Sequence, residues 1–377
     1  MRIGILTLPL HTNYGGILQA YALQTVLERM GHEVVVFDTP NNAFLPPLWK
    51  LPFIFLKRIV LKFLGKTERV FVEHHRNKTF PVIAKNIQPF VDSYIHRKII
   101  RGFDKLKKED YDAIVVGSDQ VWRARYFSAW TGQSIVDAYL AFAQHWPIRR
   151  IAYAASFGTD DWEYDEEQTK GCGEFLRKFD AVSMREISGV DLCKSKFNVI
   201  ALHVLDPTML LNVADYIALF EKANTPKSKG TLLNYVLDGA EEIFALINNI
   251  STEKHLVPFA VNNPFEFDES KPLNERTKPS VETWLRGFYD AEFVVTDSFH
   301  ACVFSILFKK QFVVVGNKER GMSRFESLLK TFGLENRLVN ADVDVSVLQP
   351  IDYVRVYDVY DKLKEKSVEY LSETLNS

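Results

Sequence analysis

The 377-residue sequence has few cysteines and no long hydrophobic run. These two features argue against a disulfide-rich, zinc-binding or membrane-spanning protein. Its three cysteines, Cys172, Cys193 and Cys302, show no CxxC spacing, so the sequence predicts neither a disulfide framework nor a zinc site. No uninterrupted apolar run reaches the roughly 18 residues that a membrane-spanning helix needs. The apolar start RIGILTLPL lacks a basic leader region and a small-residue cleavage site. We therefore interpret it as a first strand and expect a cytoplasmic protein.

An excess of one charge sign is absent as well. The formal net charge is -2, from 46 basic and 48 acidic residues, which gives no reason to expect nucleic acid as a partner. A hydrophobic content of 47% with 25% charged residues is ordinary for a soluble globular protein. The length is large for one core and suggests two domains.

What the chain does contain is an alternation of apolar strands and amphipathic helices, which predicts parallel, doubly wound α/β sheets, here two of them. RIGILTL, a helix from about Ile17 to Met30, and EVVVFD make the first β-α-β unit, and the pattern restarts after LDPTMLL. The polar segment Lys222–Gly230 is the predicted linker. We expect an N-terminal domain over residues 1–221, a second domain over 222–350, and a C-terminal helix over 351–377 that crosses back to the first domain.

His300 stands where a ligand of such a sheet would bind. Ligands of open α/β sheets lie beyond the carboxyl ends of strands and beside helix N-termini. The apolar run EFVVTD before His300 predicts a buried strand, and CVFSILF after it predicts a helix. An imidazole at that junction, close to Asp297 and Ser298, is typical of acid–base chemistry. The alternative is a histidine that caps the helix or packs in the core.

Other predicted strand ends carry polar residues suited to a small anion. The stretch Asn13-Tyr14-Gly15-Gly16 follows the first strand, and its glycines would let backbone N–H groups approach an anion, although a tight turn needs the same glycines. It is not GxGxxG, so a dinucleotide fingerprint fails. Arg185 could hold a carboxylate or phosphate bidentately, or pair with Glu186.

Two further groups complete the predicted anion site. Asp119, Gln120 and Ser156 follow two other strands; the first two could bind substrate or cap a helix. The loop NKERGMSR precedes a late helix and offers a second cationic clamp. Its basic residues are Lys318, Arg320 and Arg324. The residues alone thus predict a two-domain enzyme with a cleft that holds a small anion, and leave the anion unnamed.

Six blocks in order resemble the polysaccharide pyruvyl transferase family. They are NYGGILQAYALQ, GSDQVW, AYAASFG, SMRE, VLDPTMLL, and DSFHACVFSILF followed by SRFESLLKTFGL. The resemblance implies two Rossmann-like domains facing a cleft, as in glycosyltransferases of the B-type architecture. It also implies transfer of the enolpyruvyl unit of phosphoenolpyruvate to a sugar, with a cyclic pyruvate ketal and phosphate as products. Phosphoenolpyruvate is then the donor substrate, and no metal or further cofactor is implied.

The resemblance assigns roles to particular residues. His300 matches the catalytic histidine, and Arg185 matches a basic residue near phosphoenolpyruvate. Ser298 stands where some members carry arginine, and Ala301 where glycine often follows the histidine, so the missing cation is expected from the NKERGMSR loop. We expect catalysis by His300 with Asp297, donor contacts from Arg185, Ser298, Phe299, Arg324, Arg320 and Lys318, and acceptor or anion contacts from Asn13, Tyr14, Gly15, Gly16, Asp119, Gln120 and Ser156.

The segment Phe44–Lys66 mixes aromatic and aliphatic residues with five lysines or arginines. Such a stretch can lie in a membrane interface, or pack on its own domain with the lysines reaching water. Because sugars of envelope polysaccharides are commonly carried on a lipid, the resemblance implies a lipid-linked acceptor. The segment then predicts a peripheral position at the inner membrane face. Two other functions fit the same pattern: a sugar-nucleotide glycosyltransferase of the same architecture, and a non-catalytic glycan-binding protein.

Overall fold

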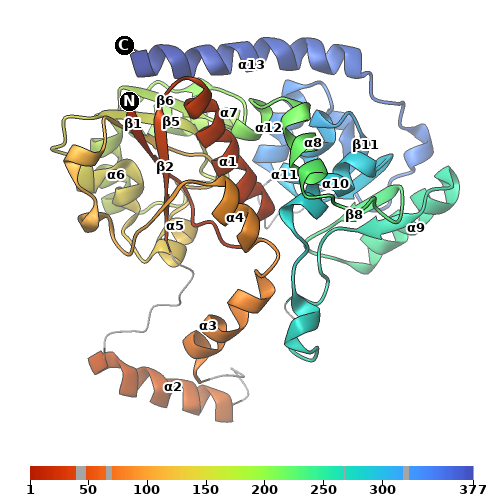
Figure 1. The fold of residues 1–377 in the computed structure, drawn as a ribbon, viewed down its shortest axis with the longest axis horizontal. Helices are drawn as coiled ribbons and strands as arrows, with labels where there is room; N and C mark the ends of the chain where they lie inside the picture. The colour runs from red at the N-terminus through yellow and green to blue at the C-terminus, as the bar shows by residue number, and fades with distance from the viewer. Residues whose placement is uncertain (40–47, 65–69, 267, 317–321, 377) are drawn as a thin grey trace.

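The computed structural model describes residues 1–39, 48–64, 70–266, 268–316 and 322–376. These residues form two lobes, each built on one parallel β-sheet (Figure 1). We call them the N-lobe, with strands β1 to β7, and the C-lobe, with strands β8 to β12. The predicted fold, two doubly wound α/β sheets, is confirmed.

The strands of the N-lobe are β1 Arg2–Leu6, β2 Glu33–Asp38, β3 Arg97–Ile99, β4 Ala113–Val116, β5 Arg149–Ala155, β6 Ala181–Met184 and β7 Leu202–His203. Those of the C-lobe are β8 Leu232–Tyr235, β9 Pro258–Ala260, β10 Phe293–Thr296, β11 Gln311–Val315 and β12 Leu338–Val339. The α-helices are α1 Tyr14–Arg29, α2 Leu51–Phe63, α3 Val72–Ile83, α4 Gln88–Tyr94, α5 Ala124–Thr131, α6 Glu166–Leu176, α7 Ile187–Phe197, α8 Val213–Lys222, α9 Glu241–Lys254, α10 Val281–Asp290, α11 Phe299–Leu307, α12 Ser323–Thr331 and α13 Tyr353–Asn376.

The order of the strands decides where a ligand can bind. The N-lobe sheet has the order β3-β2-β1-β4-β5-β6-β7, and the C-lobe sheet has the order β12-β11-β10-β8-β9. The chain therefore reverses its direction of winding between β1 and β4 in one sheet and between β8 and β10 in the other. At such points the loops at the carboxyl ends of the strands diverge and leave a crevice. The loops after β1, β4, β8 and β10 are thus the ones placed to form a site.

The central strands are apolar in sequence and are buried on both faces. All residues of β4 and β10 are buried, and both strands are rich in valine, as parallel strands covered by helices require. Helix α8 ends at Lys222, and β8 begins at Leu232, so the predicted linker Lys222–Gly230 lies between them. Helix α8 packs on α10 of the C-lobe, with the rings of Phe220 and Tyr289 5.2 Å apart.

The last helix, α13, lies across both lobes (Figure 1). On the C-lobe, the hydroxyl of Tyr357 donates to the carbonyl of Leu307 at 2.6 Å. On the N-lobe, the hydroxyl of Tyr370 donates to the carbonyl of Ala152 at 3.3 Å. Helix α13 therefore contacts both lobes at once.

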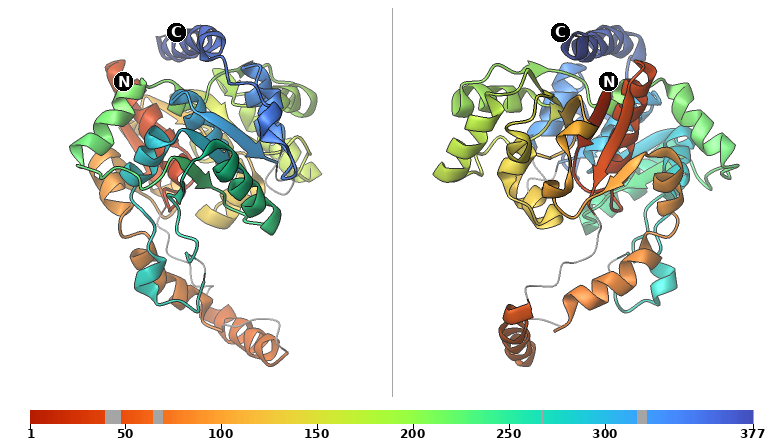
Figure 2. Two further views of the ribbon diagram at one scale, coloured as in Figure 1. Left: turned by 90° about the vertical axis from the view of Figure 1, so that its right-hand side faces the viewer. Right: turned by 60° about the vertical axis from the view of Figure 1, so that its left-hand side comes forward.

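Helices α2 and α3 project away from the lobes in every view (Figures 1 and 2). Helix α3 still contacts the C-lobe, because the backbone N–H of Lys278 donates to the carbonyl of Ile83 at 2.9 Å. No helix of the described residues is long and apolar enough to cross a membrane.

Candidate active site

The first turn of α1 lies directly against His300 at the start of α11. A Cβ atom built on Gly15 would come within 2.7 Å of the Cβ of His300 and closer still to its ring nitrogen Nδ1. On Gly16 it would lie 3.5 Å from the nearest atoms, one of them an oxygen of Asp119. We predicted a helix that begins near Ile17, whereas α1 begins at Tyr14, so both glycines are helical. Gly15 therefore serves the close approach of a side chain rather than a tight turn.

His300 is held between Gly15 and a buried carboxylate. Its Nε2 atom lies 3.6 Å from Oδ2 of Asp206, and within the described residues this nitrogen makes no hydrogen bond. Asp206 also accepts from the backbone N–H and the hydroxyl of Thr208, at 3.0 and 2.6 Å. Burial alone would raise the pKa of Asp206, but His300, Arg185 and Thr208 outweigh it and hold that pKa well below its usual range. Asp206 is thus an ionised partner that faces the imidazole.

Arg185, which follows β6, is the hub of this charge cluster. It donates to Asp206 at 2.9 Å and to Asp119, in the loop after β4, at 3.4 Å. Burial opposes its charge, but Asp206, Asp119 and Glu186 outweigh that effect and raise its pKa. Its Nε makes no hydrogen bond within the described residues. Arg185 therefore keeps its positive charge, and its Nε–H group has no acceptor among the described residues.

A second guanidinium, that of Arg324 in the first turn of α12, comes to the same place. The ring of Phe299 lies 4.4 Å from the guanidinium carbon of Arg185 and 5.7 Å from that of Arg324. Burial, together with the positive charge of Arg185, lowers the pKa of Arg324 to about 10. Two arginines that repel each other in a buried site are typical of an anion-binding pocket.

Glu186 and Ser156 stand behind the arginines. One oxygen of the Glu186 carboxylate accepts from the backbone N–H of Phe157 at 3.0 Å, and the other is buried without a hydrogen bond in the described part of the chain. Burial raises the pKa of Glu186, although Arg185, Arg324 and Ser156 favour its charged form. The hydroxyl of Ser156 accepts from the N–H of Gly158 at 3.0 Å. Ser156 therefore fixes the loop after β5.

Asp297 and Ser298 occupy the junction between β10 and α11. The two oxygens of Asp297 accept from the backbone N–H groups of Leu237 and Asp238, at 2.8 and 2.9 Å. Asp297 thus holds the loop that follows β8. Ser298 is the residue before α11, and its N–H donates to Thr296 at 3.0 Å. Lys318 and Arg320, expected as donor contacts, lie outside the described residues.

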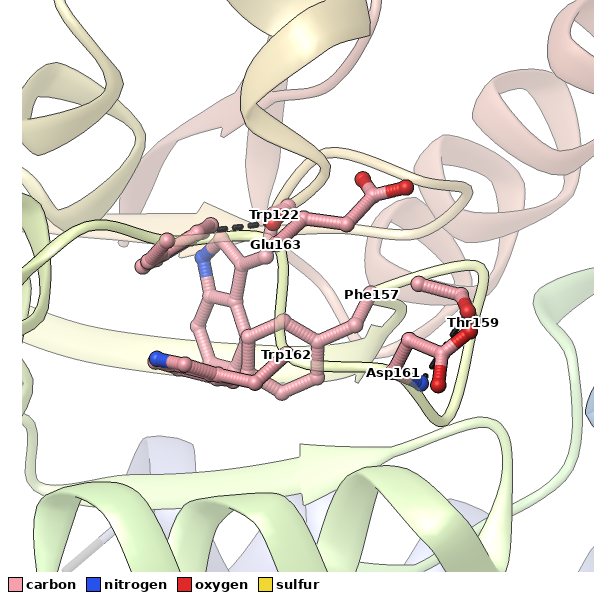
Figure 3. A pocket seen from close by; sticks show the side chains of 7 residues that line it. Trp122, Phe157, Thr159, Asp161, Trp162 and Glu163 are labelled. Carbon is pink, nitrogen blue, oxygen red and sulfur yellow. Dashed lines mark hydrogen bonds between the residues drawn. The ribbon is translucent and has the colours of Figure 1, made fainter.

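Gln120 is tied to a packed aromatic layer beneath the site. Its side-chain oxygen accepts from Arg123 at 3.0 Å, and Arg123 pairs with Glu163 at 2.8 Å. Glu163 borders a small hollow whose walls include the rings of Trp122 and Trp162 (Figure 3). The hollow is too small to admit a water molecule. This layer supports the loops after β4 and β5 and offers no room for a substrate.

A cavity of about 670 Å³ opens between the lobes beside the first turn of α1. The N-lobe contributes Asn13 and Trp130 to its lining, and the C-lobe contributes polar residues from the loops after β8 and β9. Among the lining residues are Asn13, Trp130, Asn234, Phe244, Asn262 and Lys278. The side-chain oxygen of Asn234 is buried and has no hydrogen-bond partner among the described residues. The cavity therefore borders the start of α1, whose Gly15 contacts His300.

Tyr14 joins the lobes next to this cavity. Its hydroxyl donates to the carbonyl of Pro279 at 2.7 Å, and its ring stacks on Trp284 with centroids 5.6 Å apart. Burial raises its pKa far above the ordinary value for tyrosine. The side chain is therefore engaged in interlobe packing.

The structure brings five of the residues that we singled out into one cluster, and it adds Asp206. His300, Phe299, Arg185, Arg324 and Asp119 form one cluster. Asp206 lies in the block VLDPTMLL, which carried the family resemblance, but we did not single it out. An acid next to a proline after a short strand was the available signal. Within the described residues, no group of three or more His, Cys, Asp or Glu side chains is placed to hold a metal ion.

Comparison with known proteins identifies the family. The model of the polysaccharide pyruvyl transferase family matches residues 13–319, most of the chain. The chain belongs to this family. The resemblance inferred from the six blocks is thereby confirmed, and it places the protein among transferases. His300, Arg185, Asp119 and Asp206 all lie inside the part of the chain that the pyruvyl transferase model matches, whereas Arg324 lies beyond it. No curated protein matches the sequence.

Solved structures with a similar course of the chain bind sugar nucleotides. Arabidopsis thaliana UGT89C1, complexed with UDP-L-rhamnose, is 8% identical with a TM-score of 0.49, over 99% of this chain and 98% of that one. The UDP-GlcNAc 2-epimerase of Neisseria meningitidis, bound to UDP-GlcNAc, is 9% identical with a TM-score of 0.49, over 100% and 99%. We draw nothing about the site from likeness at this level. The two-lobed architecture rests on the sheet topology described above.

Proposed function

We propose that this pyruvyl transferase family member moves the enolpyruvyl unit of phosphoenolpyruvate to a sugar, forms a pyruvate ketal and releases phosphate. The observation that carries the proposal is the convergence of Arg185, Arg324 and His300 at the Phe299 ring. Phosphoenolpyruvate has a phosphate and a carboxylate, and it therefore calls for two cationic groups beside a proton donor. The cluster supplies these groups from both lobes, and the proposed reaction uses no further cofactor.

In the proposed complex, each arginine binds one anionic end of the donor. Asp206 and Asp119 orient Arg185 and so fix the direction of its Nε–H group. The guanidinium of Arg324 lies near the same Phe299 ring. The N-terminus of α1 points its first-turn N–H groups toward the site and adds favourable potential for an anion. A bound anion would also relieve the repulsion between the two guanidinium groups.

The proposed chemistry starts with a proton from Nε2 of His300 to the methylene carbon of phosphoenolpyruvate. The resulting positive charge at C2 is attacked by one sugar hydroxyl, whose proton returns to Nε2 of His300. The bond from C2 to the phosphate oxygen then breaks, a second hydroxyl closes the ring, and its proton leaves with the phosphate. The negative charge of Asp206, 3.6 Å from Nε2, stabilises the protonated form of the imidazole. The donor and the diol therefore yield the ketal and phosphate with all atoms accounted for.

We propose that the interlobe cavity receives the sugar. Its volume of about 670 Å³ suits one or two sugar rings, and it begins next to the turn that contacts His300. The ring of Trp130 offers an apolar face, and the unpartnered oxygen of Asn234 offers an acceptor for a sugar hydroxyl. We further propose that this sugar is carried on a lipid and that the reaction takes place at the cytoplasmic membrane face.

Phosphate release from phosphoenolpyruvate, measured with a panel of free, nitrophenyl and lipid-linked sugars, tests the proposal. We expect release only when an acceptor with two suitably placed hydroxyls is present. Turnover of a nucleotide sugar instead would identify a glycosyltransferase. If phosphoenolpyruvate also fails to raise the melting temperature, which any specific ligand must do, the donor assignment is wrong and a glycan-binding role gains support.

A further inference from the structure

Helix α2 exposes an apolar surface that the other described residues do not cover. None of its residues is buried, although α2 is rich in aromatic and aliphatic side chains. Phe53 is 73% exposed and Phe63 is 88% exposed. Packing on the described residues therefore leaves much of the apolar surface of α2 exposed. Residues 44–47, 65 and 66 of the predicted segment lie outside the described residues.

Five of the exposed apolar residues form one stripe along α2 and the turn before it. They follow one another at spacings of four and three, which places them on a single helical face. The stripe consists of Trp49, Phe53, Leu56, Val60 and Phe63, and all five are exposed. The opposite side of α2 contacts the start of α3. Arg58 pairs with Glu73 at 2.7 Å, and the rings of Phe55 and Phe71 lie 5.0 Å apart. The stripe is thus the face that is turned away from the protein.

Helix α2 and the turn before it carry basic residues and no acidic ones. Lys50, Lys57 and Lys62 are exposed, and no aspartate or glutamate occurs between residues 48 and 64. Symmetric pairing of this stripe with that of a second copy would bring six lysines together without a balancing acid. An anionic surface with an apolar layer beneath it matches both the charge and the stripe.

We propose that α2 lies in the interface of an anionic phospholipid bilayer, with the stripe facing the acyl chains and the three lysines at the headgroups. Thirteen residues give a helix of about 20 Å, too short to span the hydrocarbon core and suited to lie along it. This inference uses no step of pyruvyl transfer, because it rests on the exposed stripe and its charge.

One consequence deepens the proposed function and rests on it. Helix α3 carries α2 and ends at the wall of the interlobe cavity: the carbonyl of Ile83 accepts from the N–H of Lys278, and the side chain of Asn86 donates to the carbonyl of Lys278, both at 2.9 Å. Lys278 lines the cavity. A membrane-bound α2 would hold the cavity at a fixed height above the bilayer, where a lipid-linked sugar can reach it.

Flotation of the purified full chain with vesicles tests the inference. We expect binding to phosphatidylcholine vesicles that contain phosphatidylserine, release as salt rises, and weak binding to phosphatidylcholine alone. The variant Lys50→Glu/Lys57→Glu/Lys62→Glu should bind about 100-fold more weakly, because each basic residue near an anionic surface is worth about 5-fold. Phe53→Ser/Phe63→Ser should also lose binding. The matched control is Lys105→Glu/Lys107→Glu/Lys108→Glu, which makes the same charge change at exposed positions of the N-lobe.

The outcomes separate this inference from the proposed function. All variants should keep the wild-type melting temperature, because α2 has no buried residue, and should release phosphate normally with a soluble acceptor. Wild-type protein that ignores anionic vesicles at low salt, or a lysine variant that binds as tightly as the control, would overturn the inference. A dimer seen by light scattering and dispersed by Phe53→Ser/Phe63→Ser would assign the stripe to a second copy instead. A protein that binds vesicles but shows no phosphate release would contradict the proposed function and would still support membrane binding by α2.

Discussion

Gly15 leaves the space that the imidazole of His300 fills: a Cβ on Gly15 would overlap the ring nitrogen Nδ1 and lie 2.7 Å from the Cβ of His300. The glycine belongs to the N-lobe and the histidine to the C-lobe. The position of the imidazole is therefore set by contact between the lobes as well as by its own helix.

Gly15→Ala should lower turnover by about 100-fold or more, because the methyl group displaces the proton donor. The matched control is Gly16→Ala, where the added methyl would meet its nearest atoms at an ordinary 3.5 Å. Both sites are helical, so alanine is intrinsically favourable at each. Phosphate release and melting temperature should be measured together. Equal activity in the two variants would mean that His300 does not need its observed position.

His300→Asn should likewise cost about 100-fold or more in turnover while the affinity for phosphoenolpyruvate changes little, because a positioned acid acts on the reaction rather than on binding. Single-turnover phosphate release and a thermal shift with phosphoenolpyruvate distinguish the two effects. If the variant fails to fold, the alternative of a core histidine is favoured.

Asp206→Asn should lower the free energy of unfolding by about 3 kcal/mol at pH 7, because it leaves Arg185 without its closest buried carboxylate. The depressed pKa of Asp206 means that its stabilising contribution is complete above the ordinary carboxylate pKa of about 3.9 and is lost as the pH falls below it. The difference in stability between wild type and variant should therefore shrink as the pH is lowered from 5 toward about 3. Urea unfolding at several pH values measures it. A difference independent of pH would show that the charge of Asp206 is not what stabilises the cluster.

Arg324→Ala should weaken phosphoenolpyruvate binding by at least about tenfold, since charge-assisted hydrogen bonds contribute roughly 1.5–3 kcal/mol. In the wild type, affinity should also fall as the pH rises through about 10, where Arg324 loses its proton and its positive charge. Calorimetry from pH 8 upward checks both effects. Lys330→Ala, an exposed change of equal charge on the same helix, is the control. Equal affinity in the two variants would leave the second cation to Lys318 or Arg320.

The sequence was sufficient to place His300, Arg185 and Asp119 at one edge of the sheets. Parallel strands must be joined by crossover helices, so their carboxyl ends meet at one side, and polar residues after buried runs are readily seen. Asp206 escaped this reasoning because it follows β7, a strand of only two residues at the edge of the sheet. A strand that short leaves almost no apolar pattern to mark the position.

The direction in which a side chain points was the second feature that the sequence could not predict. Tyr14 occupies the first position of α1, where an aromatic ring can face either a ligand or a neighbouring lobe, and only tertiary packing selects Trp284. The same holds for Arg58. Its position in the basic, aromatic segment predicted that it faces a membrane. In the structure it forms an ion pair with Glu73, fifteen residues later, and so faces α3 instead.

The position of α13 constrains how the cleft can open. Hydrogen bonds from Tyr357 and Tyr370 fasten α13 to both lobes along one side of the molecule, while the opposite side is bridged by contacts such as that between Ile83 and Lys278. A hinge rotation of one lobe against the other would then have its axis near α13. The largest displacement would then fall at the far edge, beside α3, so the proposed acceptor would enter from the side on which α2 projects.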